Sequence, residues 1–250
     1  MINGIEVIFE EGFVIDKNVE AIINSANNGL LLGRSGAGRI RDITGVLQDP
    51  SPEMDEFKQI CDDIGPLGRF CWRWLESDAK RYAEEGNPIP VGPTYVQLEC
   101  LRKIRDNNGE PLKIGDAVIT SSGDFAKDPS KPKYIIHVVG MGYEWPEYPI
   151  NPETGQKNPR PTIEATEKSV TDALVNSFGL LKQYSIRSVA LPIMCARVEN
   201  RGDKIKAYGL TPEKSYQIAL DVIRRYGTQL RKVIVCADNE STQTLVRGLK

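Results

Sequence analysis

The pattern of hydrophobic positions along the chain predicts strands that alternate with helices. Residues 5–9 alternate apolar and acidic residues and predict a first strand. Short apolar runs that also predict strands occupy residues 19–23, 117–120, 134–139, 188–191 and 232–236. Between these runs, helical segments are predicted over residues 39–44, 163–181, 211–223 and 241–249. Such alternation predicts an α/β fold, a three-layer α/β/α sandwich around a mixed, largely parallel sheet.

A segment of about residues 46–112 interrupts this alternation and is predicted to be mainly helical. Ser51 is followed by Pro52, which is a typical helix start, and apolar residues then repeat at helical spacing. A second amphipathic helix is predicted over residues 67–82, whereas residues 95–104 fit either an extra strand or a short helix. The segment is therefore interpreted as a helical insertion rather than a linker.

The polar residues after the second predicted strand carry the strongest functional signal. Asn24 and Asn27 come directly after the apolar run, and each carboxamide can both donate and accept hydrogen bonds, which suits a vicinal diol such as a ribose. The glycine-rich segment that follows contains Gly33, Ser35, Gly36 and Gly38. Converging backbone amides and a helix N-terminus favour phosphate. A plain strand-to-helix loop explains the glycines about as well, but the two asparagines favour a nucleotide-like ligand.

Composition narrows the class of protein. At 250 residues the chain can bury an ample core, and we expect one domain over residues 1–250 that contains the insertion. With 26% charged residues and a formal net charge of −2, bulk charge gives no reason to expect a nucleic-acid partner. No apolar run approaches membrane-spanning length, so we expect a cytoplasmic protein that binds no membrane. Five scattered cysteines and one histidine predict no disulfide framework and no metal site. No cofactor is expected.

Three blocks of the sequence, in this order, resemble the macrodomain family of ADP-ribose-binding modules. They are residues 24–30 with the glycine-rich segment after them, residues 115–123 and residues 134–140, and the similarity continues through residues 188–192 and 232–235. The resemblance implies a macrodomain-like fold that binds ADP-ribose or a related NAD-derived nucleotide. The glycine-rich loop and the loop after Pro192 would hold the diphosphate, and Asn27 would hold the distal ribose.

The resemblance also implies which residues contact the ligand. The expected set is Phe13, Val14, Asn24, Asn27, Gly33, Ser35, Gly36, Ala37, Gly38, Ile40, Cys195, Ala196, Arg197 and Tyr208. Macrodomains usually carry, at the position of Phe13, an aspartate that accepts the adenine amino group. In this chain Phe13 either stacks on a purine or packs in the core.

Catalysis is less strongly indicated than binding. In the commonest macrodomain hydrolases an aspartate and a histidine occupy the positions of Ala37 and Arg41, and neither of these residues is a general base at neutral pH. The alternative function is an ADP-ribosyl hydrolase that removes ADP-ribose from protein or nucleic acid, or an ADP-ribose-1''-phosphate phosphatase. ADP-ribosylated macromolecules are then the larger partners that the resemblance implies.

The segment after Pro192 departs from the family pattern. Glycines are lacking at the turn, and residues 198–206 form a charged insertion that is interpreted either as a solvated loop or as a support for phosphate. Arg197 is the candidate phosphate ligand there, and Tyr208 is the candidate aromatic that caps the ribose. His137 lies in the middle of a predicted strand and is expected to be structural rather than a catalytic base.

Overall fold

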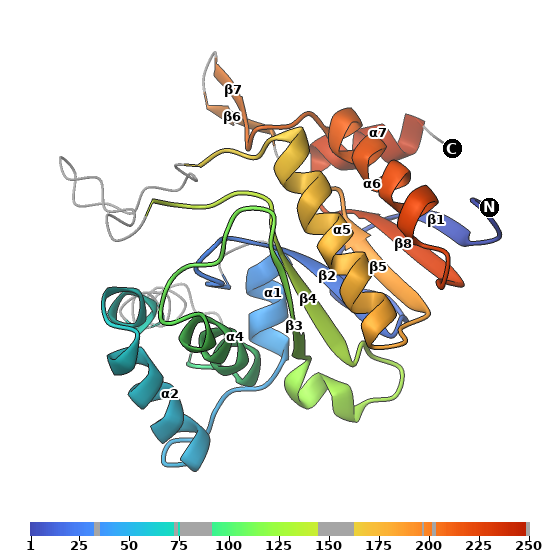
Figure 1. The fold of residues 1–250 in the computed structure, drawn as a ribbon. Helices are drawn as coiled ribbons and strands as arrows, with labels where there is room; N and C mark the ends of the chain where they lie inside the picture. The colour runs from blue at the N-terminus through green and yellow to red at the C-terminus, as the bar shows by residue number, and fades with distance from the viewer. Residues whose placement is uncertain are drawn as a thin grey trace.

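A six-stranded sheet forms the centre of the protein (Figure 1). The computed structural model describes residues 1–32, 36–72, 75, 92–144, 163–196, 198–201 and 204–248. The strands lie in the order β1-β8-β5-β2-β4-β3. Their bounds are β1 Glu6–Glu11, β2 Ala21–Ala26, β3 Ala117–Ser121, β4 Tyr134–Val139, β5 Ser188–Pro192 and β8 Lys232–Ala237. All neighbouring strands are parallel except β3, which pairs with β4 in the antiparallel sense at one edge. The predicted mixed, largely parallel sheet is thus confirmed.

Helices cover both faces of this sheet (Figure 1). One face packs against α5 (Glu167–Gln183), α6 (Pro212–Tyr226) and α7 (Glu240–Gly248). The other packs against α1 (Gly36–Ile43), α2 (Pro52–Asp63), α4 (Tyr95–Asp106) and the short 3-10 helices η1 (Val14–Asp16) and η2 (Gly123–Lys127). The three-layer α/β/α architecture predicted from the sequence is therefore confirmed.

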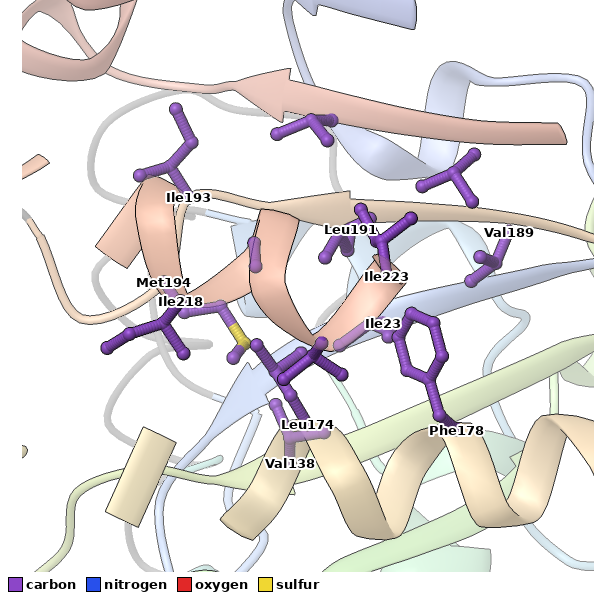
Figure 2. Close-up of a cluster of buried hydrophobic side chains, with 14 of the residues drawn as sticks. Ile23, Val138, Leu174, Phe178, Val189, Leu191, Ile193, Met194, Ile218 and Ile223 are labelled. Atoms are coloured by element: carbon purple, nitrogen blue, oxygen red, sulfur yellow. The ribbon is translucent and has the colours of Figure 1, made fainter. Parts of the chain in front are cut away.

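Adjacent residues of each central strand enter different layers of the core. Ile22 and Ile23 of β2 are both fully buried, and they belong to the hydrophobic clusters on opposite faces of the sheet. In Figure 2, Ile23 and Leu191 of the strands face Phe178 of α5 and Ile223 of α6. Because both faces are covered, these strands have continuous apolar runs instead of alternating polar and apolar residues.

Much of the described part of the insertion is helical, in α2 and α4. Ser51 caps α2, since its hydroxyl accepts a hydrogen bond from the Met54 amide at 3.1 Å, as expected for a serine before proline. Residues 95–104, which fitted either a strand or a helix, form α4, and the Thr94 hydroxyl caps this helix. The later part of the helix predicted over residues 67–82 lies largely outside the described residues.

Three local features differ from the sequence-based expectations: the end of one strand, the start of one helix and one segment predicted as a loop. Strand β2 continues to Ala26, because Asn24 and Ser25 pair with β4, and α1 begins at Gly36 rather than at Arg39. The charged segment predicted as a loop forms an antiparallel hairpin of β6 (Val198–Arg201) and β7 (Lys204–Ala207). Its strands are only four residues long and mostly polar, so no apolar run predicted them.

No helix within the described part of the chain is both long enough and apolar enough to cross a membrane.

Candidate functional site

A cavity of about 830 Å³, including its open mouth, lies at the edge of the sheet where the parallel strands end. This edge of an open α/β sheet is where ligands bind. The wall comes from the ends of β2, β4, β5 and β8, the start of α1 and the segment after β1. Its described residues are Phe13, Val14, Ile23, Asn24, Ser25, Gly36, Ala37, Ile40, Met141, Pro192, Ile193, Met194, Cys195, Ala196, Tyr208, Asp238 and Asn239.

Most of the residues predicted to contact a ligand come together in this wall. They are Phe13, Val14, Asn24, Gly36, Ala37, Ile40, Cys195, Ala196 and Tyr208. Asn27 and Gly38 are not in the described wall; Gly38 is buried within α1. Gly33, Ser35 and Arg197 lie outside the described residues.

Asn24 is held in the wall by the one histidine of the chain. The Asn24 carboxamide nitrogen lies 3.1 Å from His137 Nδ1, and Thr120 Oγ1 lies 3.0 Å from His137 Nε2. Burial lowers the pKa of His137 to about 3, so the ring is neutral at physiological pH. A neutral ring that accepts from Asn24 at Nδ1 carries its proton on Nε2 and donates to Thr120. His137 is therefore structural, as expected, and its role is to orient Asn24.

Asn27 uses its carboxamide to build the loop after β2. Its Oδ1 accepts hydrogen bonds from the Gly29 and Leu31 amides at 3.1 and 3.2 Å, and its Nδ2 donates to the Leu31 carbonyl at 2.8 Å. Bonds from an asparagine side chain to nearby backbone are typical of tight turns. Asn27 would use the same donor and acceptor atoms to contact a ligand. The residue type alone therefore does not distinguish an asparagine that builds the loop from one that binds the ligand. Direct contact of Asn27 with a ligand stays a prediction.

Two buried side chains hold the backbone that leads into the glycine-rich segment. Gln97 of α4 accepts a hydrogen bond from the Leu32 amide at 3.1 Å and donates to the Leu30 carbonyl at 3.3 Å. Arg41 of α1 donates to the Leu32 carbonyl at 3.3 Å. Leu30 adopts a left-handed conformation, with φ 53°, and is fully buried. The helix α4 thus fixes the approach to the glycine-rich segment, a role that nothing in the sequence pattern indicated.

The first turn of α1 opens onto the cavity. Gly36, Ala37 and Ile40 line the wall, and α1 begins at Gly36. The first amide groups of an α-helix have no acceptor within the helix, and they favour negatively charged groups. This turn therefore presents an anion-binding element to the cavity.

The segment after β5 lines the same cavity. Cys195 has a left-handed backbone, with φ 55°, and its carbonyl accepts a hydrogen bond from the Leu210 amide at 3.3 Å. The Ser215 hydroxyl donates to the Met194 carbonyl at 2.6 Å. Burial raises the pKa of the Cys195 thiol to about 11, so the thiol stays protonated and is a poor nucleophile at neutral pH.

Asp238 and Asn239, which sequence reasoning missed, come from the end of β8. Both line the cavity, and a Cβ placed on Gly36 would lie 3.5 Å from Asp238 Oδ2 and 3.9 Å from Phe13 Cδ1. Their position directly after the last predicted strand could have indicated that they line the site, because all the parallel strands of a sheet end at the same edge. The other lining residues that were not predicted are Ile23, Ser25, Met141, Pro192, Ile193 and Met194.

Comparison with known proteins shows what the chain is similar to. Residues 90–201 match the family model of the Macro domain. The chain is 27% identical over 155 residues to O-acetyl-ADP-ribose deacetylase 1 from Pantoea vagans, which covers 60% of this chain and 72% of that protein. It is 23% identical over 225 residues to a macro domain-containing protein from Caldanaerobacter subterraneus subsp. tengcongensis, covering 89% and 83%. A mutant Oceanobacillus iheyensis macrodomain with ADPR superposes with a TM-score of 0.56 at 20% identity, covering 99% and 93%. The chain is thus similar in sequence to the Macro domain over residues 90–201, and it shares the fold of solved macrodomains.

Ala37 and Arg41 occupy the two positions where the resemblance places an acid and a base. Ala37 contributes only a methyl group to the cavity wall. Arg41 is 3% exposed, and its Nε donates to Asp42 Oδ1 at 2.8 Å, so the guanidinium is engaged in the protein interior. Among the described lining residues of the cavity, Asp238 carries the one carboxylate.

Proposed function

We propose that this protein is a macrodomain that binds ADP-ribose or a related NAD-derived nucleotide in the cavity at the carboxyl edge of its sheet. The observation that carries the proposal is that the first turn of α1 and the oriented carboxamide of Asn24 line the same cavity. A helix N-terminus attracts phosphate, and a fixed carboxamide can both donate to and accept from sugar hydroxyls. A sugar joined to a diphosphate requires both elements in one site.

The diphosphate is proposed to lie between Gly36 and Ala37 on one side and the segment from Ile193 to Ala196 on the other. Asn24 and Tyr208 are then proposed to contact the distal ribose. Gly33, Ser35 and Arg197 are proposed to complete the phosphate site, and Asn27 is proposed to shape the loop beside it.

The relatives support a ligand of this class. The Oceanobacillus iheyensis macrodomain that shares the fold is a complex with ADPR, and the Pantoea vagans relative is named as a deacetylase of O-acetyl-ADP-ribose. ADP-ribosylated macromolecules are accordingly proposed as larger partners, through the same cavity.

Isothermal titration of the protein with ADP-ribose tests the proposal. We expect saturable binding of one ligand, and we expect Asn24→Ala to weaken it by about 1–3 kcal/mol, because ligand hydroxyls lose their partner in a desolvated site. The matched control is Asn176→Ala, which removes an exposed carboxamide on α5. No binding by the wild-type protein, or equal affinity for wild type and Asn24→Ala, would contradict the proposal.

A second candidate function is hydrolysis of an ADP-ribose conjugate. The relationship to a named deacetylase favours it, whereas Ala37 and Arg41 offer no general base. Incubation with O-acetyl-ADP-ribose, with ADP-ribosylated protein or nucleic acid, or with ADP-ribose-1''-phosphate, followed by product analysis over hours, distinguishes binding from turnover. Binding without product supports the first function alone.

A further inference from the structure

A second cavity lies in the helical insertion. It measures about 690 Å³ with its open mouth, and its described lining residues are Lys58, Cys61, Asp62, Arg69 and Trp72. None of these residues belongs to the described wall of the first cavity. The insertion therefore carries a cavity of its own, which the proposed function does not use.

Two helical segments supply these side chains. The first three lie at positions i, i+3 and i+4 of α2, so they share one face of that helix. The last two lie three positions apart in the helical segment 66–72. The two segments touch at Gly68, where a Cβ would overlap the carbonyl oxygen of Cys61. Glycine at this position thus lets the two faces meet beside the cavity.

Trp72 gives the cavity an aromatic wall. Its ring packs against Phe57 of α2, with the ring centroids 6.0 Å apart and an angle of 47° between the planes. Phe57 is fully buried and Trp72 only partly, so the core fixes an indole that also borders the cavity. Burial raises the pKa of the Cys61 thiol to about 12, so this part of the wall stays uncharged. These two side chains suit a flat, apolar ligand group.

The charged side chains of the described wall are two cations and one carboxylate. Arg69 is exposed and forms no ion pair with any described residue. Lys58 lies 3.3 Å from each carboxylate oxygen of Asp49, but both side chains are exposed, and such pairs contribute little. Asp62 supplies the carboxylate, which opposes a ligand with several negative charges. The balance favours a ligand with a single acidic group.

We propose that this cavity binds a small aromatic acid, whose ring lies against Trp72 and whose acidic group pairs with Arg69 and Lys58. A guanidinium suits a carboxylate because its planar donors match the two oxygens. The site is separate from the proposed nucleotide site, and this inference goes beyond the proposed function without depending on it.

Isothermal titration with naphthalene-2-carboxylate and naphthalene-2-carboxamide tests the role of charge, because the two probes have nearly the same shape. We expect saturable binding of the carboxylate and about fivefold weaker binding of the amide, the scale of an exposed ion pair. Arg69→Gln should remove this preference, and Arg69→Lys should keep part of it. Arg225→Gln, which removes an exposed arginine on α6, is the matched control and should keep it in full. No saturable binding of the carboxylate, or the same preference in wild type and Arg69→Gln, would overturn the proposal.

Trp72→Leu tests the aromatic wall. We expect it to weaken both probes by a similar factor of several-fold, whereas Trp72→Phe should keep more of the affinity. Tyr226→Leu, which removes an exposed ring at the end of α6, is the matched control and should leave both affinities unchanged. Unchanged affinity in a folded Trp72→Leu protein would overturn the role of the ring. Thermal melting identifies variants that fail to fold, and for those the position of the probe on the wild-type protein decides.

Amide chemical shifts locate the probe on the wild-type protein. We expect naphthalene-2-carboxylate to shift the amides of Lys58, Cys61 and Arg69 and to leave those of Asn24 and Gly36 unchanged. Saturation with ADP-ribose should not alter the affinity for the probe. Shifts at Asn24 and Gly36, or competition with ADP-ribose, would place the probe in the first cavity and overturn the inference. Failure of ADP-ribose to bind would contradict the proposed function alone.

Discussion

His137 Nδ1 lies 3.1 Å from the carboxamide nitrogen of Asn24, and the two residues sit directly opposite each other in the β2–β4 pairing. The histidine is fully buried, whereas Asn24 borders the cavity. A group in the core of the sheet therefore determines how a side chain in the site is oriented. This relationship links the stability of the fold to the affinity of the site.

The stability of the protein should decrease as the pH falls below about 6.5 because of His137. Burial lowers the pKa of this residue from 6.5 to about 3, so the unfolded chain binds a proton that the folded protein excludes. Stability from this group is complete above pH 6.5 and is lost between pH 6.5 and about 3. The expected decrease between pH 7 and 5.5 is about 1 kcal/mol, measured by urea unfolding.

His137→Gln provides the control for this pH dependence, because glutamine does not titrate. The variant should be less stable at pH 7, and its stability should vary less over the same pH interval. The chain has no other histidine, so the difference between the two profiles belongs to this residue. Identical slopes for the two proteins would show that His137 titrates normally in the folded state.

Asn27→Ala should reduce both stability and ligand affinity. The substitution leaves the Gly29 and Leu31 amides without their acceptor, and each lost hydrogen bond costs about 0.5–1.5 kcal/mol. Asn27→Asp keeps that acceptor and should recover part of the stability in thermal melting. If affinity returns with stability, Asn27 acts by shaping the loop; affinity that stays low in a stable variant would instead point to direct contact with the ligand.

Gln97→Leu should loosen the backbone before the glycine-rich segment. Leucine fills a similar volume but leaves the Leu32 amide and the Leu30 carbonyl without partners, at about 1–3 kcal/mol for each unsatisfied group. We expect lower stability and faster amide hydrogen exchange at Leu32 than in the wild type. Gln97→Glu keeps the acceptor for Leu32 and should protect that amide. Unchanged exchange in Gln97→Leu would contradict the proposed clamp.

Gly36→Ala and Gly36→Trp should separate small from large side chains at the first turn of α1. A Cβ here meets its nearest neighbours, Asp238 and Phe13, at 3.5 and 3.9 Å, which is ordinary contact, so alanine should keep most of the affinity. An indole must extend into the cavity and should abolish ADP-ribose binding, with little change in melting temperature. Tight binding by Gly36→Trp would place the ligand elsewhere.

The architecture was predictable from the sequence because its central strands are buried on both faces. Residues such as Ile22 and Ile23 must then all be apolar, and the runs are visible without any structure. The helix starts were also predictable, because they depend on neighbouring residues only. Ser51 and Pro52 define the beginning of α2 with no partner other than a nearby backbone amide. The candidate site was predictable in part, since residues directly after parallel strands share one edge of the sheet.

The tertiary structure decided what each polar side chain at that edge does. Asn24 and Asn27 are the same residue type three positions apart, yet one lies in the cavity wall and the other binds its own loop. Asp238 approaches Phe13 only because β8 lies beside β1, a pairing across most of the length of the chain. Hydrophobic burial repeats along the sequence and can be recognised locally. A hydrogen-bond partner depends on which distant segment folding places within about 3 Å, and local sequence does not contain that information.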